Sequence, residues 1–271
     1  MRRNGTGRRA DSFEVRSWDG TLLKVWVGGV GTPIVLVHGS FTDHTAWAVP
    51  NTQLEKHFTT FAMDRRGFGA SGDGPEYSIE RDFEDVSAVV AAVAARSSRP
   101  VVLWGHSYGA NCAMGGASLS TDVQHLILYE PSFGISYPEG VIEEAEAALA
   151  AGDRETAVAR MLFDVLEMSS AEIDTLRSGP RWSLILAGAH TAPRECRVEE
   201  SWKYRPGQFA GIHAPTLLLS GSESPSSVTT ATRRAAGAIA GSRIHMLDGH
   251  GHFAHRTDPE MVVSLILEFV S

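Results

Sequence analysis

A serine between two glycines is the feature of this sequence that points most directly to chemistry. The motif Gly105-His106-Ser107-Tyr108-Gly109 follows the apolar run Val101 to Trp104 and precedes helix-compatible residues Ala110 to Met114. A sharp turn between a strand and a helix exposes such a serine, and glycines on both sides allow the two elements to approach closely. The start of the helix also favours negative charge that develops beside the serine. We therefore predict Ser107 as a nucleophile.

Other side chains able to do chemistry fall just after predicted strands or in the loops that follow. Together with Ser107, these side chains are those of His38, Asp64, Glu130, Glu223 and His252. In a parallel sheet covered by helices, ligands bind beyond the carboxyl ends of the strands. We therefore expect these residues to share one site.

Alternating strands and helices are expected to position this site. The predicted strands are 13–16, 22–27, 34–37, 58–63, 101–104, 123–129, 216–220 and 243–247, and the predicted helices of the core are 45–56, 78–95, 110–114, 226–239 and 257–270. The first two strands flank an Asp-Gly turn and form a hairpin. The later alternation predicts an α/β fold with a mostly parallel sheet.

Residues 134–211 interrupt this alternation. They lack a buried strand pattern, and their clearest helices are predicted at Val141–Ala151 and Thr156–Met168. We interpret them as a helical cap inserted after the sixth strand, between core segments 12–133 and 212–271. Residues 1–11 are basic without an apolar run behind them, which indicates a flexible tail and not a signal peptide.

Composition limits the classes of partner. The 271 residues carry a formal net charge of −8, which argues against nucleic acid as a partner. No segment approaches the roughly 18 to 20 unbroken apolar residues of a membrane span. Cys112 and Cys196 are too few for a disulfide framework. We expect a cytoplasmic monomer or homodimer that acts on a small molecule.

Four motifs, in this order, resemble the α/β-hydrolase superfamily. They are His38-Gly39, Asp64-Arg65-Arg66-Gly67-Phe68-Gly69-Ala70-Ser71, Gly105-His106-Ser107-Tyr108-Gly109, and Gly249-His250-Gly251-His252 ahead of Asp258-Pro259-Glu260. The resemblance runs from Phe13 onward. It implies the α/β-hydrolase fold: an eight-stranded, mostly parallel sheet flanked by helices, with a helical cap. It also implies catalysis without a metal or an organic cofactor.

The resemblance also implies roles for single residues. Ser107 is similar to the family nucleophile and His252 to the general base, which takes the serine proton and later passes it to the leaving group. The backbone N–H groups of Tyr108, and of Ser40 or Phe41, match the oxyanion hole. By contrast, we interpret His38, His106 and the Asp64 loop as structural.

The acid of the catalytic triad departs from the usual pattern. Where the family places an aspartate after the seventh strand, this chain has Gly221-Ser222-Glu223-Ser224-Pro225. Some members of the family take a glutamate from the end of the sixth strand instead, and Glu130 fits that position and the order Ser, Glu, His. We therefore predict Glu130 as the acid, with Glu223 and Asp248 as rivals.

A histidine cluster raises the alternative of a metal site. His250, His252 and His255 have spacing found in zinc hydrolases, but Ala254 stands where such sites carry an aspartate. We expect no metal here.

We predict a serine hydrolase that cleaves a carboxylic ester or lactone through an acyl-enzyme. The same residues are consistent with a thioesterase, a carbon–carbon hydrolase, a cofactor-free perhydrolase or haloperoxidase, or a small-molecule receptor on this scaffold. In the predicted cap, Trp182, Trp202 and Phe163 are candidates to bind an apolar or aromatic acyl group. They are equally consistent with the cap's own core.

Overall fold

A central eight-stranded sheet organises the computed structural model, which describes residues 11–202 and 204–271. The strands are β1 (Asp11–Arg16), β2 (Leu22–Gly29), β3 (Thr32–Val37), β4 (Phe58–Met63), β5 (Val101–His106), β6 (Val123–Tyr129), β7 (Thr216–Gly221) and β8 (Arg243–Leu247). Their spatial order is β1-β2-β4-β3-β5-β6-β7-β8. In the part of the chain that the structure describes, β2 pairs antiparallel with β1 and β4, and all other neighbouring strands of the sheet are parallel. The predicted, mostly parallel sheet is confirmed.

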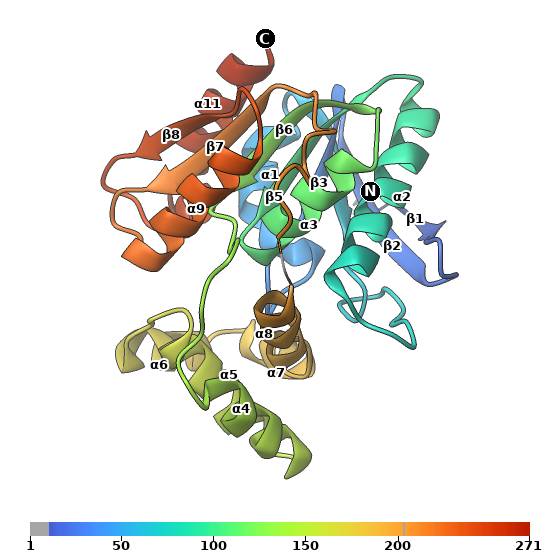
Figure 1. The fold of residues 1–271 in the computed structure, drawn as a ribbon. Helices are drawn as coiled ribbons and strands as arrows, with labels where there is room; N and C mark the ends of the chain where they lie inside the picture. Colours follow the sequence, from blue (N-terminus) through green and yellow to red (C-terminus); the bar gives the residue numbers. More distant parts are fainter. Residues whose placement is uncertain (1–10, 203) are drawn as a thin grey trace, which may run out of the picture.

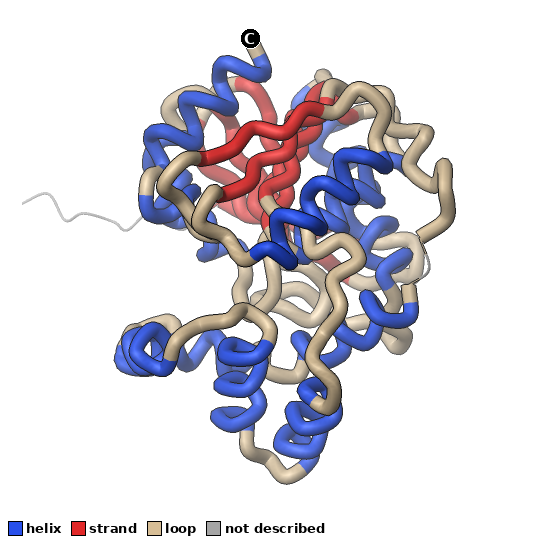
Figure 2. The backbone as a smooth tube through the Cα atoms, turned by 60° about the vertical axis from the view of Figure 1, so that its left-hand side comes forward, coloured by secondary structure: helices blue, strands red, loops and turns tan. Residues whose placement is uncertain are grey.

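Helices cover both faces of this sheet (Figures 1 and 2). On one face lie α2 (Ile79–Ser97), α3 (Tyr108–Ser118) and α9 (Ser226–Ala238), and on the other lie α1 (Ala48–Leu54) and α11 (Pro259–Val270). Successive side chains of β3 point to opposite faces of the sheet. Val35 and Val37 pack against the helices of the first face, and Ile34 and Leu36 pack against those of the second. Burial on both faces explains why the central strands are continuous apolar runs.

Five helices between β6 and β7 lie together at one end of the sheet domain, on the side away from the C-terminus (Figure 1). They are α4 (Val141–Ala150), α5 (Arg154–Asp164), α6 (Ser170–Ser178), α7 (Trp182–Ala187) and α8 (Thr191–Ser201). We call these five helices the cap. The cap has its own buried apolar cluster, separate from the two that sandwich the sheet. It therefore packs partly as a unit of its own.

The predicted helix Thr156–Met168 is wrong in its extent. Helix α5 begins earlier because the Asp153 carboxylate caps it, accepting from the Thr156 N–H at 2.9 Å. It ends at Asp164, and a capping box between Ser169 and Glu172 then starts α6. The predicted helix therefore extends four residues too far at its C-terminal end, and α6 is a separate helix beyond it.

Local capping divides the predicted core helix 45–56, whereas the predicted helix 257–270 forms as α11 (Pro259–Val270). The segment 45–56 forms a 3₁₀ turn, η1 (His44–Trp47), followed by α1. Near the C-terminus, the short helix α10 (Ala254–Thr257) precedes α11, whose first turn is capped by the Asp258 side chain.

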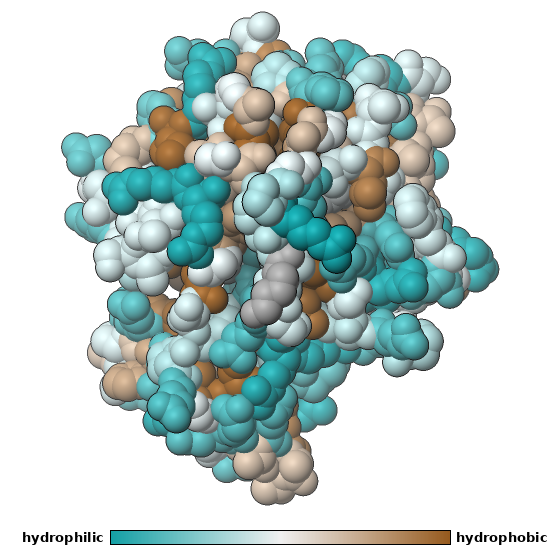
Figure 3. Space-filling model, in the orientation of Figure 1, coloured by the Kyte–Doolittle hydropathy of each residue, from teal (hydrophilic) through white to brown (hydrophobic). Residues whose placement is uncertain are grey.

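The predicted tail, 1–11, lies outside the described residues except for Asp11, which begins β1. Across the part of the chain that the structure describes, no helix combines the length and hydrophobicity needed to cross a membrane. The face drawn in Figure 3 is mostly hydrophilic, with apolar residues in small separate patches.

Candidate active site

Ser107 occupies a strained turn between β5 and α3. Its φ and ψ are 56° and −130°, and α3 begins at the next residue. A Cβ on Gly109 would lie 2.2 Å from the carbonyl oxygen of His38, and one on Gly105 would lie 2.4 Å from that of Gly109. Only glycine fits at these two positions, so the two glycines of the motif are required for the turn to pack.

Glu130 and His252 form a hydrogen-bonded pair beside this turn. Glu130 directly follows β6, and its Oε2 lies 2.5 Å from Nδ1 of His252, which sits in the loop after β8. The other carboxylate oxygen accepts from the N–H of Gly221 at 2.6 Å. Because a carboxylate can only accept, Nδ1 carries the proton and Nε2 is left free to accept one. The pair thus fixes the tautomer and the orientation of the imidazole ring.

The two rival acids lie elsewhere. Glu223 and Asp248 are both exposed, whereas Glu130 is 1% exposed. Neither rival lines the cavity that contains Ser107. Among the three carboxylates, only Glu130 faces the imidazole in this structure.

His38 and His106 are buried and bonded to backbone. Nε2 of His38 accepts from the N–H of Arg65 at 3.0 Å, and burial lowers its pKa to about 3. His106 donates from Nε2 to the carbonyl oxygen of His252 at 2.9 Å. Burial, together with the nearby His255 and His252, lowers the pKa of His106 well below the ordinary value. Both histidines are therefore neutral and form hydrogen bonds with backbone groups, which fits the structural role predicted for them.

The loop after β3 lies between core and cap. It carries Ser40 and Phe41, which line the same cavity as Ser107 and Tyr108. The Ser40 hydroxyl donates to Oε2 of Glu195, on α8, at 2.5 Å. Oε1 of the same carboxylate accepts from Arg65 at 2.5 Å, and Nε of Arg65 donates to the carbonyl oxygen of His38 at 2.9 Å. The candidate oxyanion loop is thus tied to both parts of the molecule.

A second buried carboxylate, Glu199, lies one turn further along α8. Its oxygens accept from Asn111 at 2.7 Å, from Ser132 at 2.5 Å, and from the Tyr137 hydroxyl. Burial is the largest influence and raises the pKa of Glu199 to about 8, against the opposing effect of its hydrogen bonds. At neutral pH this side chain is therefore mostly protonated.

Two adjoining cavities meet at the serine. Cavity A has a volume of about 170 Å³ and cavity B about 350 Å³. Both are lined by Ser40, Phe41, Ser107, Leu166, His252 and Phe253. The cap contributes to both, so it encloses the space in front of the nucleophile.

Left-handed backbone conformations concentrate at cavity A. Among the described residues, five that are not glycine have positive φ, and four of them line this cavity: Phe41, Ser107, Glu130 and Glu167. Such conformations cost roughly 1–3 kcal/mol each and cluster at functional sites. This is an independent reason to place the site here.

The three aromatic residues predicted to bind substrate line neither cavity, which corrects that expectation. Trp182 is buried in the cap and donates from Nε1 to Glu155 at 2.7 Å. Trp202 packs against the rings of Phe83, Phe133 and Phe209. Phe163 is 51% exposed beside a separate surface hollow. Two of these side chains serve packing, and the third faces solvent.

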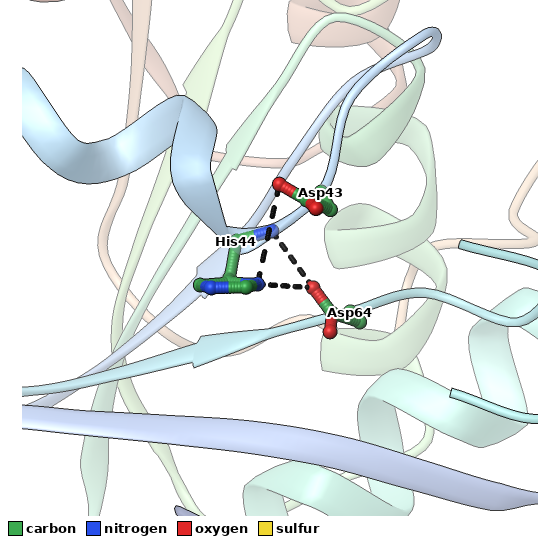
Figure 4. A group of neighbouring side chains, drawn as sticks. All are labelled: Asp43, His44 and Asp64. Atoms are coloured by element: carbon green, nitrogen blue, oxygen red, sulfur yellow. Dashed lines mark hydrogen bonds and ion pairs between the residues drawn. The ribbon is translucent and has the colours of Figure 1, made fainter. Parts of the chain in front are cut away.

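The side chains of Asp43, His44 and Asp64 point toward one another, as Figure 4 shows. Asp64 accepts from the backbone N–H and Nδ1 of His44, both at 2.8 Å, and from Nε1 of Trp26 at 2.9 Å. Oδ1 of Asp43 accepts from the N–H and the hydroxyl of Thr45. Because these oxygens already have donors, we assign the cluster a structural role in holding the loop.

Several lining residues were not predicted from the sequence. Glu195 and Glu199 line cavity A, while Arg181 and Arg256 line cavity B. The i,i+4 spacing of the two glutamates was the only signal available, and on an exposed helix the same spacing is ordinary.

Comparison with known proteins identifies the family to which the chain belongs. A family model described as "Alpha/beta hydrolase family" matches residues 34–265. N-formylmaleamate deformylase of Pseudomonas putida is 33% identical over 107 residues, which is 38% of this chain and 39% of that protein. The (E)-2-((N-methylformamido)methylene)succinate hydrolase of Acinetobacter baylyi is 26% identical and covers 86% of this chain and 88% of its own length.

Solved structures give the same result. An alpha/beta hydrolase from Sphaerobacter thermophilus superimposes with a TM-score of 0.83 at 28% identity, covering 96% of this chain and 100% of its own. The enol-lactonase from Burkholderia xenovorans gives a TM-score of 0.75 at 22% identity, over 95% of this chain and 99% of its own. At that identity the likeness concerns the fold alone.

Proposed function

Because this chain belongs to the alpha/beta hydrolase family, we propose that it cleaves a carboxylic ester or lactone of a small, largely apolar molecule through an acyl-enzyme on Ser107. The observation that carries the proposal is the Glu130–His252 pair, joined at 2.5 Å, in the cavity that contains Ser107. A serine hydroxyl is a weak nucleophile unless a base takes its proton. The free Nε2 of His252 supplies that base.

In the proposed reaction, Nε2 of His252 takes the Ser107 proton as the serine oxygen attacks the ester carbonyl carbon. The carbonyl electrons move to its oxygen, which the N–H groups of Tyr108 and of Ser40 or Phe41 stabilise. Collapse of this tetrahedral intermediate breaks the bond between the carbonyl carbon and the alcohol oxygen, and His252 gives its proton to that oxygen. Water then attacks the acyl-enzyme by the same route and releases the acid and Ser107.

The helical cap, predicted at 134–211, is proposed to shape the substrate pocket. Leu166 and Phe41 form apolar walls on both sides of the serine. These walls support an apolar segment next to the scissile bond. Since one named relative is a deformylase, N-formyl amides form a second substrate class for the same machinery.

A substrate panel with an active-site probe tests this proposal. Esters and lactones of graded chain length are assayed beside N-formyl amides, with the wild type and Ser107→Ala. We expect turnover of at least one ester or lactone, and labelling of Ser107 by a fluorophosphonate. Loss of both in a folded Ser107→Ala variant supports the acyl-enzyme. Labelling of another serine, or turnover that persists in the variant, overturns it.

A further inference from the structure

Charge is divided unequally between the two cavities that meet at Ser107. Cavity A is lined by Glu130, Asp164, Glu167, Glu195 and Glu199, and no described lysine or arginine lines it. Cavity B is lined by Arg181 and Arg256, and none of its described lining residues is a carboxylate. Glu199 is mostly protonated at neutral pH and Glu195 is paired with Arg65, so the clearer charge imbalance is the positive one in cavity B.

The two guanidinium groups of cavity B come from different parts of the molecule. Arg181 precedes α7 in the cap, and Arg256 lies in α10, just after the catalytic loop. Both are half-buried. Arg181 donates to the Thr42 hydroxyl at 2.7 Å, and Arg256 lies over the ring of Phe253. Neither contact neutralises a charge.

These two cations are close enough to repel one another. Burial and then Arg181 lower the pKa of Arg256, and burial lowers that of Arg181, with Asp43 opposing the shift. Asp43 does not line the cavity but offsets part of the charge of Arg181, and no carboxylate is paired with Arg256 among the described residues. Two half-buried like charges that share a cavity favour an anion between them.

Much of the remaining wall of cavity B is apolar. Its walls include Leu162, Leu176 and Ile185 from the cap and Val49 from α1. A ligand that fits this cavity is an anionic group on a hydrocarbon chain. The planar fork of a guanidinium matches a carboxylate in particular.

We infer that cavity B is a carboxylate-binding subsite, formed by Arg181 and Arg256, that selects ester or lactone substrates carrying a carboxylate away from the scissile bond. This inference rests on the proposed hydrolase function and names its substrate class. The anion would join the cap, through Arg181, to the core, through Arg256.

Matched pairs of esters test the subsite. One pair is 4-nitrophenyl hydrogen adipate and its methyl ester, with the charge on the acyl side. The other is 4-carboxyphenyl hexanoate and its methyl ester, with the charge on the leaving group. We expect kcat/KM to favour the charged member of at least one pair. In Arg181→Gln and Arg256→Gln this charged-to-neutral ratio should fall roughly tenfold or more, as loss of a charge-assisted hydrogen bond implies.

Arg99→Gln is the control, because Arg99 is exposed and lies just before β5, at the sheet edge opposite Ser107. Its ratio should equal that of the wild type. A wild type that prefers the neutral member of both pairs, or a ratio that neither arginine changes, refutes the subsite. Neutral-ester cleavage that depends on Ser107 would still support the hydrolase itself.

Inhibition of the wild type gives a test that needs no variant. Hexanoate and hexanamide have the same chain, and only the first carries a charge. We expect hexanoate to inhibit neutral-ester cleavage at least several-fold more strongly. Equal inhibition by the two compounds contradicts the proposal.

Discussion

Glu195 of the cap and Arg65 of the core form an ion pair of 2.5 Å, and each side chain is only 1% exposed. The same carboxylate accepts from the Ser40 hydroxyl, while Arg65 also binds the carbonyl oxygens of His38 and Gly39. The loop expected to supply the oxyanion hole is therefore fixed by α8 on one side and by Arg65 on the other. If this loop forms the proposed oxyanion hole, a cap residue helps to hold it in place.

Ser40→Ala tests this connection with a small change. The substitution leaves the backbone N–H of the loop in place and removes only the hydroxyl that donates a hydrogen bond to Glu195. We expect kcat to fall about tenfold, since a hydrogen bond to a charged group contributes roughly 1.5–3 kcal/mol. KM should change less, because the loop acts on the transition state. Steady-state kinetics on a neutral ester provide the measurement.

Ser264→Ala serves as its control, because it removes an exposed hydroxyl from α11, on the far face of the sheet. It should leave both constants unchanged. If Ser40→Ala alters KM alone, the hydroxyl acts in substrate binding and not in positioning the loop.

Gly109→Ala is expected to damage both folding and activity. The new Cβ would lie 2.2 Å from the carbonyl oxygen of His38 and 2.5 Å from that of Val37, and backbone atoms at a strand end have little room to move. Overpacking of this kind costs roughly 1–3 kcal/mol. Urea denaturation monitored by circular dichroism measures the loss.

Gly237→Ala offers a matched comparison within helix α9, where an added Cβ meets nothing within 4 Å. Because glycine is unfavourable inside a helix, this variant should gain roughly 0.5–1 kcal/mol. A Gly109→Ala variant as stable as the wild type would mean that the turn tolerates a side chain.

Positions that depend on local pattern were predictable from the sequence. Ser107 and Glu130 each end a continuous apolar run, and such runs become buried strands whose carboxyl ends meet at one edge. The order of strands and helices predicted a mostly parallel sheet covered by helices, and the spatial order of the strands came from the structure.

Positions that depend on tertiary packing were not predictable. A tryptophan such as Trp182 suits a substrate pocket or a small core equally well, and only the arrangement of the cap helices decides between them. Glu195 and Glu199 look like surface residues in sequence, because their buried partners come from segments far along the chain. The helix break after Asp164 depends on the cap at Ser169, which competes with helical periodicity over the same residues.

The raised pKa of Glu199 predicts a particular dependence of stability on pH. Its value of about 8 in the folded state lies above the ordinary 4.5, mainly because of burial. The folded state therefore holds this proton more tightly than the unfolded state. Its contribution to stability is greatest below about pH 4.5 and is lost as the pH rises to about 8.

Glu199→Gln removes this titration while keeping a neutral side chain of the same shape. Thermal unfolding midpoints of the variant should therefore fall less steeply than those of the wild type between about pH 5 and about pH 8. The difference between the two curves isolates Glu199 from other titrating groups. Parallel curves would show that Glu199 is ionised in the folded protein throughout this range.

Glu130→Gln decides the acid of the proposed triad. The amide keeps the size of the side chain but cannot stabilise a protonated imidazole, and it favours the wrong tautomer of His252. In the well-studied serine protease case the equivalent change lowers kcat about ten-thousand-fold. We expect a loss on the order of a thousand-fold or more here, with the circular dichroism spectrum unchanged. Glu223→Gln, at an exposed position outside both cavities, should retain nearly full activity. Should the Glu223 variant be the inactive one, the acid belongs to the loop after β7 and the pair at 2.5 Å is not catalytic.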